Sequence, residues 1–233
     1  KWVLLHRDEL ESLTEGIRKL PRKISGRDAL ISSFRESKGD LPLSGITGSA
    51  WLESVRSVLT GAVQIDQIDQ PEGFVGVLRP YQIKGLSWLS WLAETGLGGC
   101  LADDMGLGKT VQALALLKTM ILRGEKDPVL LICPTSVIEN WRREAEHFVP
   151  DISVFIQHGI RRPRGEKFAD SIKGKDLIIT SYSLIHRDNE TFKKTEWSGV
   201  ILDEAQNIKN PETRQSKAAR SIKAKWHFAL TGT

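Results

Sequence analysis

Six short apolar runs, separated by segments of helical length, constrain the fold of this chain more than any other feature of its sequence. The runs lie at residues 99–102, 129–133, 152–157, 177–181, 200–203 and 227–231. Strand-sized apolar runs that alternate with helices are typical of a parallel sheet covered by helices on both faces. We therefore predict a doubly wound, mainly parallel α/β lobe, a fold in which ligands bind at the carboxyl ends of the strands.

The first 72 residues follow a different pattern. Their apolar spacing indicates short amphipathic helices at residues 8–20, 28–36 and 49–59. Gln70-Pro71-Glu72-Gly73 then has the composition of a turn or linker. We place a domain boundary there, with a small, mostly helical leader at residues 1–72 and the α/β lobe at residues 73–233.

The charge balance is weakly basic, because 33 Lys and Arg face 29 Asp and Glu and give a net charge of +4. Basic residues gather at 161–175 and at 209–225. Either group could contact a polyanion or simply form a solvated face, and the sequence leaves both possibilities open. No stretch reaches the roughly 18 apolar residues that a membrane span needs, which predicts no membrane partner.

Two cysteines, Cys100 and Cys133, lie inside apolar runs. They lack the spacing of metal ligands, so we expect them to be reduced core residues and we expect no structural metal.

A glycine-rich loop follows the first apolar run of the lobe and precedes an apolar helix at residues 111–122. Strand, glycine loop and helix together form a nest for phosphate oxygens. The predicted nucleotide-binding residues of this loop are Asp104, Met105, Gly106, Leu107, Gly108, Lys109 and Thr110. Lys109 would reach the β- and γ-phosphates, and Thr110 would bind Mg²⁺.

The glycine loop departs from the general pattern at one position. The strict pattern has Gly where this chain has Asp103. An ordinary glycine turn before a core helix therefore remains an alternative.

Two adjacent carboxylates, Asp203 and Glu204, end the fifth apolar run. Successive side chains of a strand point to opposite sides, so we expect the two acids to have different roles. Asp203 would hold the Mg²⁺ that Thr110 also binds, and Glu204 would orient and deprotonate the attacking water. A turn or a helix start is the alternative explanation of an isolated Asp-Glu pair.

Upstream of the glycine loop, Gln82 could complete the nucleotide site. Its amide can form two hydrogen bonds with adenine N6 and N7, which favours ATP over GTP. Taken without its position before Lys109 and Asp203, Gln82 would be an exposed residue near a helix start.

These residues, in this order, resemble the switch/sucrose-nonfermenting (Swi/Snf) family of helicase superfamily two, in its N-terminal RecA-like lobe. The matching segments are residues 78–82, 104–110, 131–136 with Asn140-Trp141, 180–182, 203–210 and 230–233. The resemblance spans about residues 73–233, and Asp103 is normal for the family. Gln206 is more similar to the prokaryotic branch.

The resemblance implies further roles. Pro134, Thr135, Ser136, Thr180 and Ser181 would contact the DNA backbone, and Gln206, Thr231 and Thr233 would couple the nucleotide state to the grip on DNA. From the residues alone, the loop at 134–136 could instead cap the next helix, and residues 231–233 could be an ordinary turn.

The resemblance also implies ATP and Mg²⁺ as cofactors, and duplex DNA as a partner along which the polypeptide moves without separating the strands. It further implies a second RecA-like lobe that supplies arginines to the transition state. This chain ends inside a motif, so we expect it to belong to a longer polypeptide and, alone, to bind ATP weakly and hydrolyse it very slowly. The expected location is cytoplasmic and nucleoid-associated in a prokaryote, or nuclear in a eukaryote.

Two competing hypotheses remain at this point. The first is an RNA-dependent helicase-type ATPase, against which the segments at residues 203–210 and 230–233 argue. The second is a docking scaffold without turnover, against which the intact Lys109, Thr110, Asp203 and Glu204 argue.

Overall fold

The computed structural model describes residues 50–232. The chain divides into two compact units, residues 1–64 and 65–233. In the first, helix α3 (Ala50–Leu59) buries Leu52 and Val55 and agrees with the helix expected at residues 49–59. The helices expected at 8–20 and 28–36, and Thr233, lie outside the described residues. The division of the chain at residues 72 and 73 stays a prediction.

The second unit contains a single six-stranded sheet in which every pairing is parallel. Its strands are β1 (Gly99–Leu101), β2 (Val129–Cys133), β3 (Val154–Ile156), β4 (Leu177–Ser181), β5 (Gly199–Leu202) and β6 (Trp226–Leu230). Their order across the sheet is β1-β6-β5-β2-β4-β3. The predicted doubly wound α/β fold is therefore confirmed, and β2 and β4 have the expected bounds.

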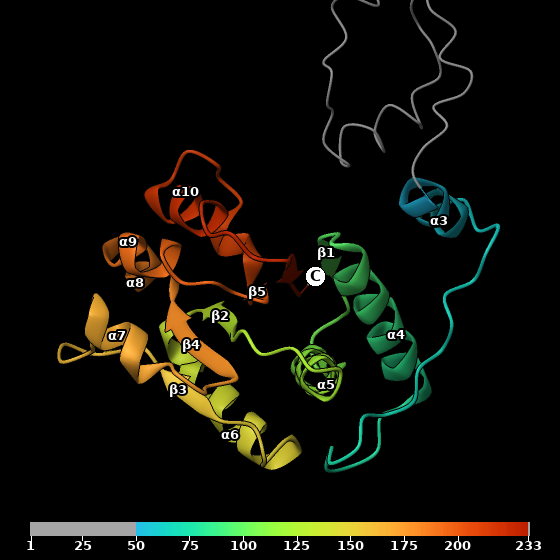
Figure 1. The fold of residues 1–233 in the computed structure, drawn as a ribbon, viewed down its shortest axis with the longest axis horizontal. Helices are drawn as coiled ribbons and strands as arrows, with labels where there is room; N and C mark the ends of the chain where they lie inside the picture. The colour runs from blue at the N-terminus through green and yellow to red at the C-terminus, as the bar shows by residue number, and fades with distance from the viewer. Residues whose placement is uncertain (1–49, 233) are drawn as a thin grey trace, which may run out of the picture. The chain divides into compact units, whose positions relative to one another are not determined.

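Helices cover both faces of the sheet (Figure 1). One face packs against α4 (Pro80–Thr95), α5 (Lys109–Leu122) and α6 (Ile138–Phe148). The other packs against α7 (Glu166–Ser171), α8 (Tyr182–Arg187), α9 (Asn189–Lys193) and α10 (Arg214–Arg220). Two short 3₁₀ helices, η1 (Thr135–Val137) and η2 (Ala205–Ile208), follow β2 and β5. Because β2 and β4 contribute apolar residues to both faces, their sequences show continuous apolar runs rather than alternation.

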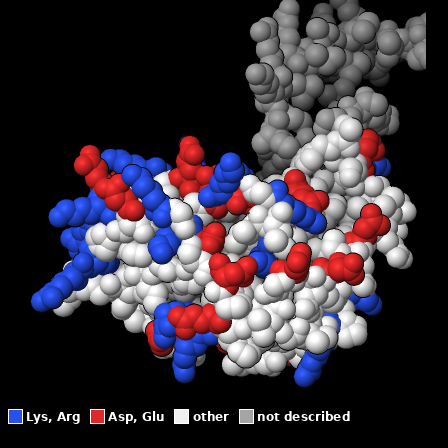
Figure 2. Space-filling view, turned by 60° about the horizontal axis from the view of Figure 1, so that its bottom comes forward, with Lys and Arg blue, Asp and Glu red and all other residues white. Residues whose placement is uncertain are grey.

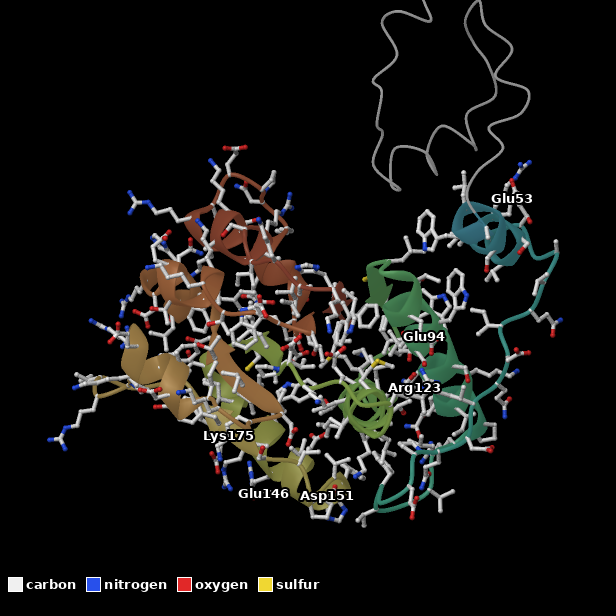
Figure 3. The ribbon with its side chains drawn as sticks, in the orientation of Figure 1. Glu53, Glu94, Arg123, Glu146, Asp151 and Lys175 are labelled. Carbon is white, nitrogen blue, oxygen red and sulfur yellow. The ribbon has the colours of Figure 1, made fainter. Side chains whose placement is uncertain are left out.

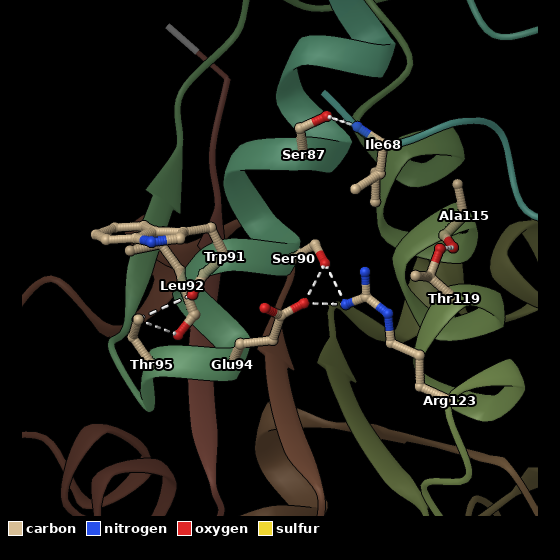
Figure 4. A network of polar contacts seen from close by, with 10 residues as sticks. All are labelled: Ile68, Ser87, Ser90, Trp91, Leu92, Glu94, Thr95, Ala115, Thr119 and Arg123. Atoms are coloured by element: carbon tan, nitrogen blue, oxygen red, sulfur yellow. Dashed lines mark hydrogen bonds and ion pairs between the residues drawn. The ribbon is translucent and has the colours of Figure 1, made fainter. Parts of the chain in front are cut away.

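Polar contacts hold α5 against α4 and so position the loop that precedes α5. The Arg123 guanidinium donates to Ser90 Oγ at 2.7 Å and forms an ion pair with Glu94. Glu94 and Arg123 point toward each other from the two helices (Figure 3), and Figure 4 shows the triangle that they form with Ser90. In the middle of α4, Ser87 Oγ accepts a hydrogen bond from the Ile68 amide at 3.0 Å, which ties the incoming segment to the helix.

The two cysteines differ in their surroundings. Cys133 is buried, and burial, followed by the charge of Asp203, raises the pKa of its thiol to about 12. Cys100 is exposed, so the prediction of a core residue is wrong for it. It lies in the middle of β1, an edge strand that pairs only with β6, and an edge strand of three residues has less helix cover than a central one.

Among residues 50–232, none of the helices combines the length and the apolar character that crossing a bilayer requires. The same residues contain no group of three or more His, Cys, Asp or Glu side chains that could hold a metal ion by themselves.

Replacing Gly199 with Ala should destabilise the sheet. A Cβ at this position would lie 2.1 Å from Cζ2 of Trp226, whose buried ring stacks on Phe228 at 4.7 Å between centroids. Overpacking of a core costs about 1–3 kcal/mol, and we expect a loss of that size in the free energy of unfolding measured with urea. Adding Trp226→Phe, which shortens the clashing ring, should return part of that stability to Gly199→Ala. An unchanged free energy in the single variant would contradict this packing.

Candidate nucleotide site

The glycine loop joins β1 to α5. Gly106 and Gly108 have φ values of +83° and +78°, the left-handed region that favours glycine. Gly108 is also the N-cap of α5, which begins at Lys109, two residues before the predicted start. A Cβ on Gly108 would lie 2.5 Å from the side-chain nitrogen of Gln82. The backbone conformation and the close approach of a neighbouring helix therefore both require glycine here.

The ammonium of Lys109 is held by the loop itself. It donates to the carbonyl oxygens of Asp103 and Asp104 at 2.5 and 2.9 Å. The carboxylate of Asp103, which stands where the general pattern has Gly, accepts a hydrogen bond from Gln112 Nε2 at 3.1 Å. The side chain that departs from the general pattern therefore adds a contact between the glycine loop and the first turns of α5.

One pocket of about 340 Å³ opens beside this loop. It is lined by Met105, Gly106, Gly108, Lys109, Thr110, Val137, Asn140, Trp141, Glu144, Asp203, Glu204 and Gly232. The sequence predicted that Lys109, Asp203 and Glu204 lie close together, and all three line this pocket. The loop after β1, the start of α6 and the end of β5 supply most of its wall, because these elements meet at the carboxyl edge of the parallel sheet.

The two predicted acids lie beyond the last residue of β5, so the expected alternation of strand side chains does not separate them. A turn separates them instead. Glu204 has φ +50°, the only positive value of a non-glycine residue among residues 50–232. Its carbonyl accepts from the amide and from the side chain of Asn207, at 3.0 and 2.8 Å, which holds this unusual backbone conformation.

Asp203 is fixed on three sides. Trp141 Nε1 donates to its Oδ2 at 2.7 Å, and the Glu204 amide donates to its Oδ1 at 2.9 Å. The Tyr182 hydroxyl donates to its backbone oxygen at 2.7 Å. Burial raises the pKa of Asp203, while these two N–H donors lower it. Burial, followed by the charge of Asp203, also raises the pKa of Glu144, another carboxylate in the pocket wall.

The donor set fits a magnesium nucleotide. Mg²⁺ is usually bound through one or two carboxylates together with substrate phosphates, rather than by a complete cage of protein ligands. Lys109, Thr110 and the partly buried Asp203 all line the pocket, so it offers an ammonium, a hydroxyl and a carboxylate.

Gln82 does not line this pocket. It is buried at the third position of α4, contrary to the alternative of an exposed residue. Its Oε1 accepts from the Arg79 amide at 2.9 Å, and its Nε2 donates to the Leu107 carbonyl at 3.2 Å. The amide thus caps α4 and supports the glycine loop. Its proposed contact with adenine stays a prediction that requires these bonds to rearrange.

A chain of hydrogen bonds leads away from Glu204. Gln206 Nε2 donates to Glu204 Oε2, and the Thr231 hydroxyl donates to Gln206 Oε1 at 3.0 Å. The Thr231 amide in turn donates to the Leu101 carbonyl at 3.1 Å, next to the start of the glycine loop. Two of the three predicted coupling residues are therefore in contact, while Thr233 lies outside the described residues.

The predicted nucleic-acid contacts fall into two groups. Pro134 is half-buried, and Thr135 and Ser136 are exposed in η1, beyond the end of β2. Their alternative role as helix caps is wrong, because neither η1 nor α6 has a side-chain cap. Thr180 and Ser181 are 0% and 1% exposed. The Thr180 hydroxyl donates to the Gln157 carbonyl at 3.1 Å, so neither of these side chains offers surface to a phosphate in this conformation.

The basic segments also divide. In the first, Arg162 is buried and forms a two-pronged ion pair with Asp188, so it supports the loop before α7. In the second, Lys217 pairs with the exposed Glu212, and Lys225 pairs with the half-buried Glu125. Figure 2 shows Lys and Arg side chains gathered on the left of that view, where acidic side chains also occur. These ion pairs occupy part of each segment, and both interpretations, a polyanion contact and a solvated face, stay open.

Sequence reasoning missed three residues of this site, namely Trp141, Glu144 and Tyr182. Trp141 was named only among the segments that resemble the family, and its indole N–H gave no signal of a carboxylate partner 62 residues later. Glu144 lies one turn further along α6, on the same face, and this spacing could have suggested it.

An all-parallel sheet with a glycine loop after β1 and two carboxylates after β5, all at one pocket, defines a RecA-like lobe of the phosphate-loop class. Residues 81–233 match the SNF2-related domain family. The chain belongs to this family.

Several relatives and solved structures are similar to this chain. It is 47% identical over 186 residues to "Putative ATP-dependent helicase/translocase YwqA" of Bacillus subtilis, covering 79% of this chain and 20% of that protein. It is 38% identical over 168 residues to "ISWI chromatin-remodeling complex ATPase ISW1" of Saccharomyces cerevisiae, covering 71% and 15%. The structure of the Sulfolobus solfataricus SWI2/SNF2 ATPase core in complex with dsDNA matches with a TM-score of 0.65 and 41% identity, covering 72% of this chain and 34% of that one. The chain thus spans about a fifth or less of the length of these two relatives.

Proposed function

We propose that this chain is the ATP-binding lobe of a DNA-stimulated ATPase that moves along duplex DNA and thereby remodels protein–DNA complexes. The observation that carries the proposal is the convergence of Lys109, Asp203 and Glu204 on one pocket. The names of two relatives, an ATP-dependent helicase/translocase and a remodelling ATPase, support the ATPase part. The DNA-bound Sulfolobus core supports the DNA part.

In this proposal the loop amides at residues 104–108 bind the phosphates, and Lys109 leaves its loop carbonyls to reach the β- and γ-phosphates. Thr110 and Asp203 hold the metal. Bound Mg²⁺ supplies charge neutralisation to the phosphates. Glu204 orients the attacking water and accepts its proton. Gln206, which donates to Glu204 and accepts from Thr231, passes the state of the site toward Thr231 and Thr233.

On the DNA side, Thr135 and Ser136 are the side chains with free surface for a phosphate, and Pro134 shapes their loop. Thr180 and Ser181 would contribute through their position at the end of β4 after a rearrangement, or would only support the fold. A second RecA-like lobe, closing over the nucleotide, would supply transition-state arginines. We keep a cytoplasmic, nucleoid-associated or nuclear location as an expectation that follows from DNA as the partner.

The test measures ATP turnover of the full natural polypeptide with duplex DNA, with RNA and without nucleic acid. We expect stimulation by duplex DNA, and we expect Lys109→Met to remove it. Lys109→Met should also weaken ATP binding about 10- to 150-fold, because a hydrogen bond to a charged group contributes about 1.5–3 kcal/mol. Lys126→Met is the matched control, since Lys126 is exposed and does not line the pocket. Stimulation by RNA alone would favour the helicase-type alternative instead.

A further inference from the structure

Helix α6 brings two side chains to the pocket from outside the loop and the acidic pair. Trp141 and Glu144 are three residues apart, so they lie on one face of the helix and both line the pocket wall. Each contacts one of the two residues proposed to hold the metal. The other acids of the helix, Glu139 and Glu146, are exposed and pair with Arg142.

Trp141 controls how the Asp203 carboxylate is turned. The Trp141 side chain is 3% exposed and packed in the core, so its ring has little freedom. Its N–H binds Oδ2 at 2.7 Å while the Glu204 amide binds Oδ1 at 2.9 Å. With one donor on each oxygen, the plane of the carboxylate is set, and each oxygen keeps a lone pair for a cation.

Glu144 acts on the other proposed ligand. Thr110 and the half-buried Glu144 line the same pocket, and the Thr110 hydroxyl is close enough to the Glu144 carboxylate to lower its pKa as a hydrogen-bond donor. A hydroxyl that gives its proton to a carboxylate presents its oxygen lone pairs in the remaining directions, which suits a metal ligand. Among residues 50–232, Glu144 takes part in none of the ion pairs, unlike Glu139 and Glu146.

We propose that Trp141 and Glu144 are positioning residues for the magnesium nucleotide, Trp141 by fixing the Asp203 carboxylate and Glu144 by orienting the Thr110 hydroxyl. This inference rests on the proposed function of the pocket. Helix α6 directly follows η1 (Thr135–Val137), whose first two residues are exposed. Helix α6 therefore contacts the proposed metal ligands and is continuous with the turn proposed to contact DNA. We expect the binding of nucleotide to change the affinity for DNA, and the binding of DNA to change the affinity for nucleotide, through α6.

The test is the magnesium dependence of nucleotide affinity, measured on the full natural polypeptide by titrating a fluorescent ADP with Mg²⁺ and again with EDTA. The measured quantity is the ratio of the two dissociation constants. Loss of a residue that orients a metal ligand typically costs 10- to 100-fold in metal affinity. We expect Glu144→Ala and Trp141→Phe to reduce the ratio about 10-fold or more, with the affinity in EDTA unchanged.

Two further variants distinguish a positioning role of Glu144 from an effect of its charge and from a loss of folding. Glu144→Gln keeps an oxygen that can accept from Thr110, so it should retain most of the wild-type ratio. Glu146→Gln alters an exposed acid on the outer side of the same helix (Figure 3) and should change nothing. If Trp141→Phe lowers the melting temperature, the comparison of Glu144→Ala with Glu144→Gln still tests whether α6 positions the metal ligands.

The outcomes are distinct. A wild-type polypeptide whose nucleotide affinity does not depend on Mg²⁺ would overturn the proposed function and this inference together. A normal wild-type ratio that Glu144→Ala leaves unchanged would overturn the inference alone. An equal loss in Glu144→Gln and Glu144→Ala would also overturn it, because charge and not orientation would then be what the site needs.

Discussion

Replacing Glu204 with Gln should slow ATP turnover of the full natural polypeptide by about 10²- to 10⁴-fold while ATP binding is retained, because that range is the usual contribution of a positioned general base. The amide cannot accept the proton of the attacking water. It can still accept the hydrogen bond that Gln206 donates to residue 204, and Lys109 and Asp203 are untouched. The variant should therefore hold ATP without hydrolysing it.

Single-turnover hydrolysis and equilibrium ATP binding, measured side by side, check this prediction. Glu212→Gln is the matched control, because Glu212 is exposed and pairs only with the exposed Lys217 in the described structure. An unaltered turnover in Glu204→Gln would exclude Glu204 as the base. A wild-type polypeptide that binds ATP without hydrolysing it would favour the scaffold hypothesis, in which the lobe serves only for docking.

The second large effect concerns the chain by itself. A polypeptide consisting of residues 1–233 should hydrolyse ATP about 10³- to 10⁵-fold more slowly than the full natural polypeptide in the presence of duplex DNA. An arginine supplied from outside a phosphate-loop site contributes that much in related enzymes. The pocket wall formed by residues 50–232 contains no arginine, so the described lobe offers no substitute.

Steady-state turnover of both proteins at saturating ATP and DNA tests this comparison. Circular dichroism and a thermal melt of the shorter protein establish that it is folded before its rate is interpreted. A rate equal to that of the full polypeptide would be the contradicting result, since it would mean that the lobe completes its own transition-state site.

The predictions that succeeded rest on local patterns. The apolar runs at 129–133 and 177–181 became central strands with those bounds, because a strand covered on both faces has no polar position to interrupt the run. The glycines at 106 and 108 marked the left-handed loop, since few other residues adopt that backbone. Because the strands are parallel, the carboxyl ends of β1 and β5 lie at the same edge of the sheet, and this brings Lys109 near Asp203 and Glu204.

Three expectations depended on neighbours that are distant in sequence. The phosphate contacts of Thr180 and Ser181 stay predictions, and both side chains are buried in this structure because β4 lies between β2 and β3. Cys100 was expected in the core, but β1 is an edge strand. The adenine contact of Gln82 also stays a prediction, and in this structure its amide donates to the Leu107 carbonyl of the glycine loop. No local pattern reports which strand lies at an edge or which helix covers a given side chain.

By itself, then, the sequence determined the class of the lobe and the identity of its central site, because both follow from periodicity, glycine conformation and the common edge of parallel strands. The tertiary structure alone decided which side chains orient that site. Trp141 and Glu144 reach the pocket beside Asp203 and Thr110 only because α6 packs on one face of the sheet next to α5. That placement depends on side-chain packing between segments more than 30 residues apart, which no short window of sequence contains.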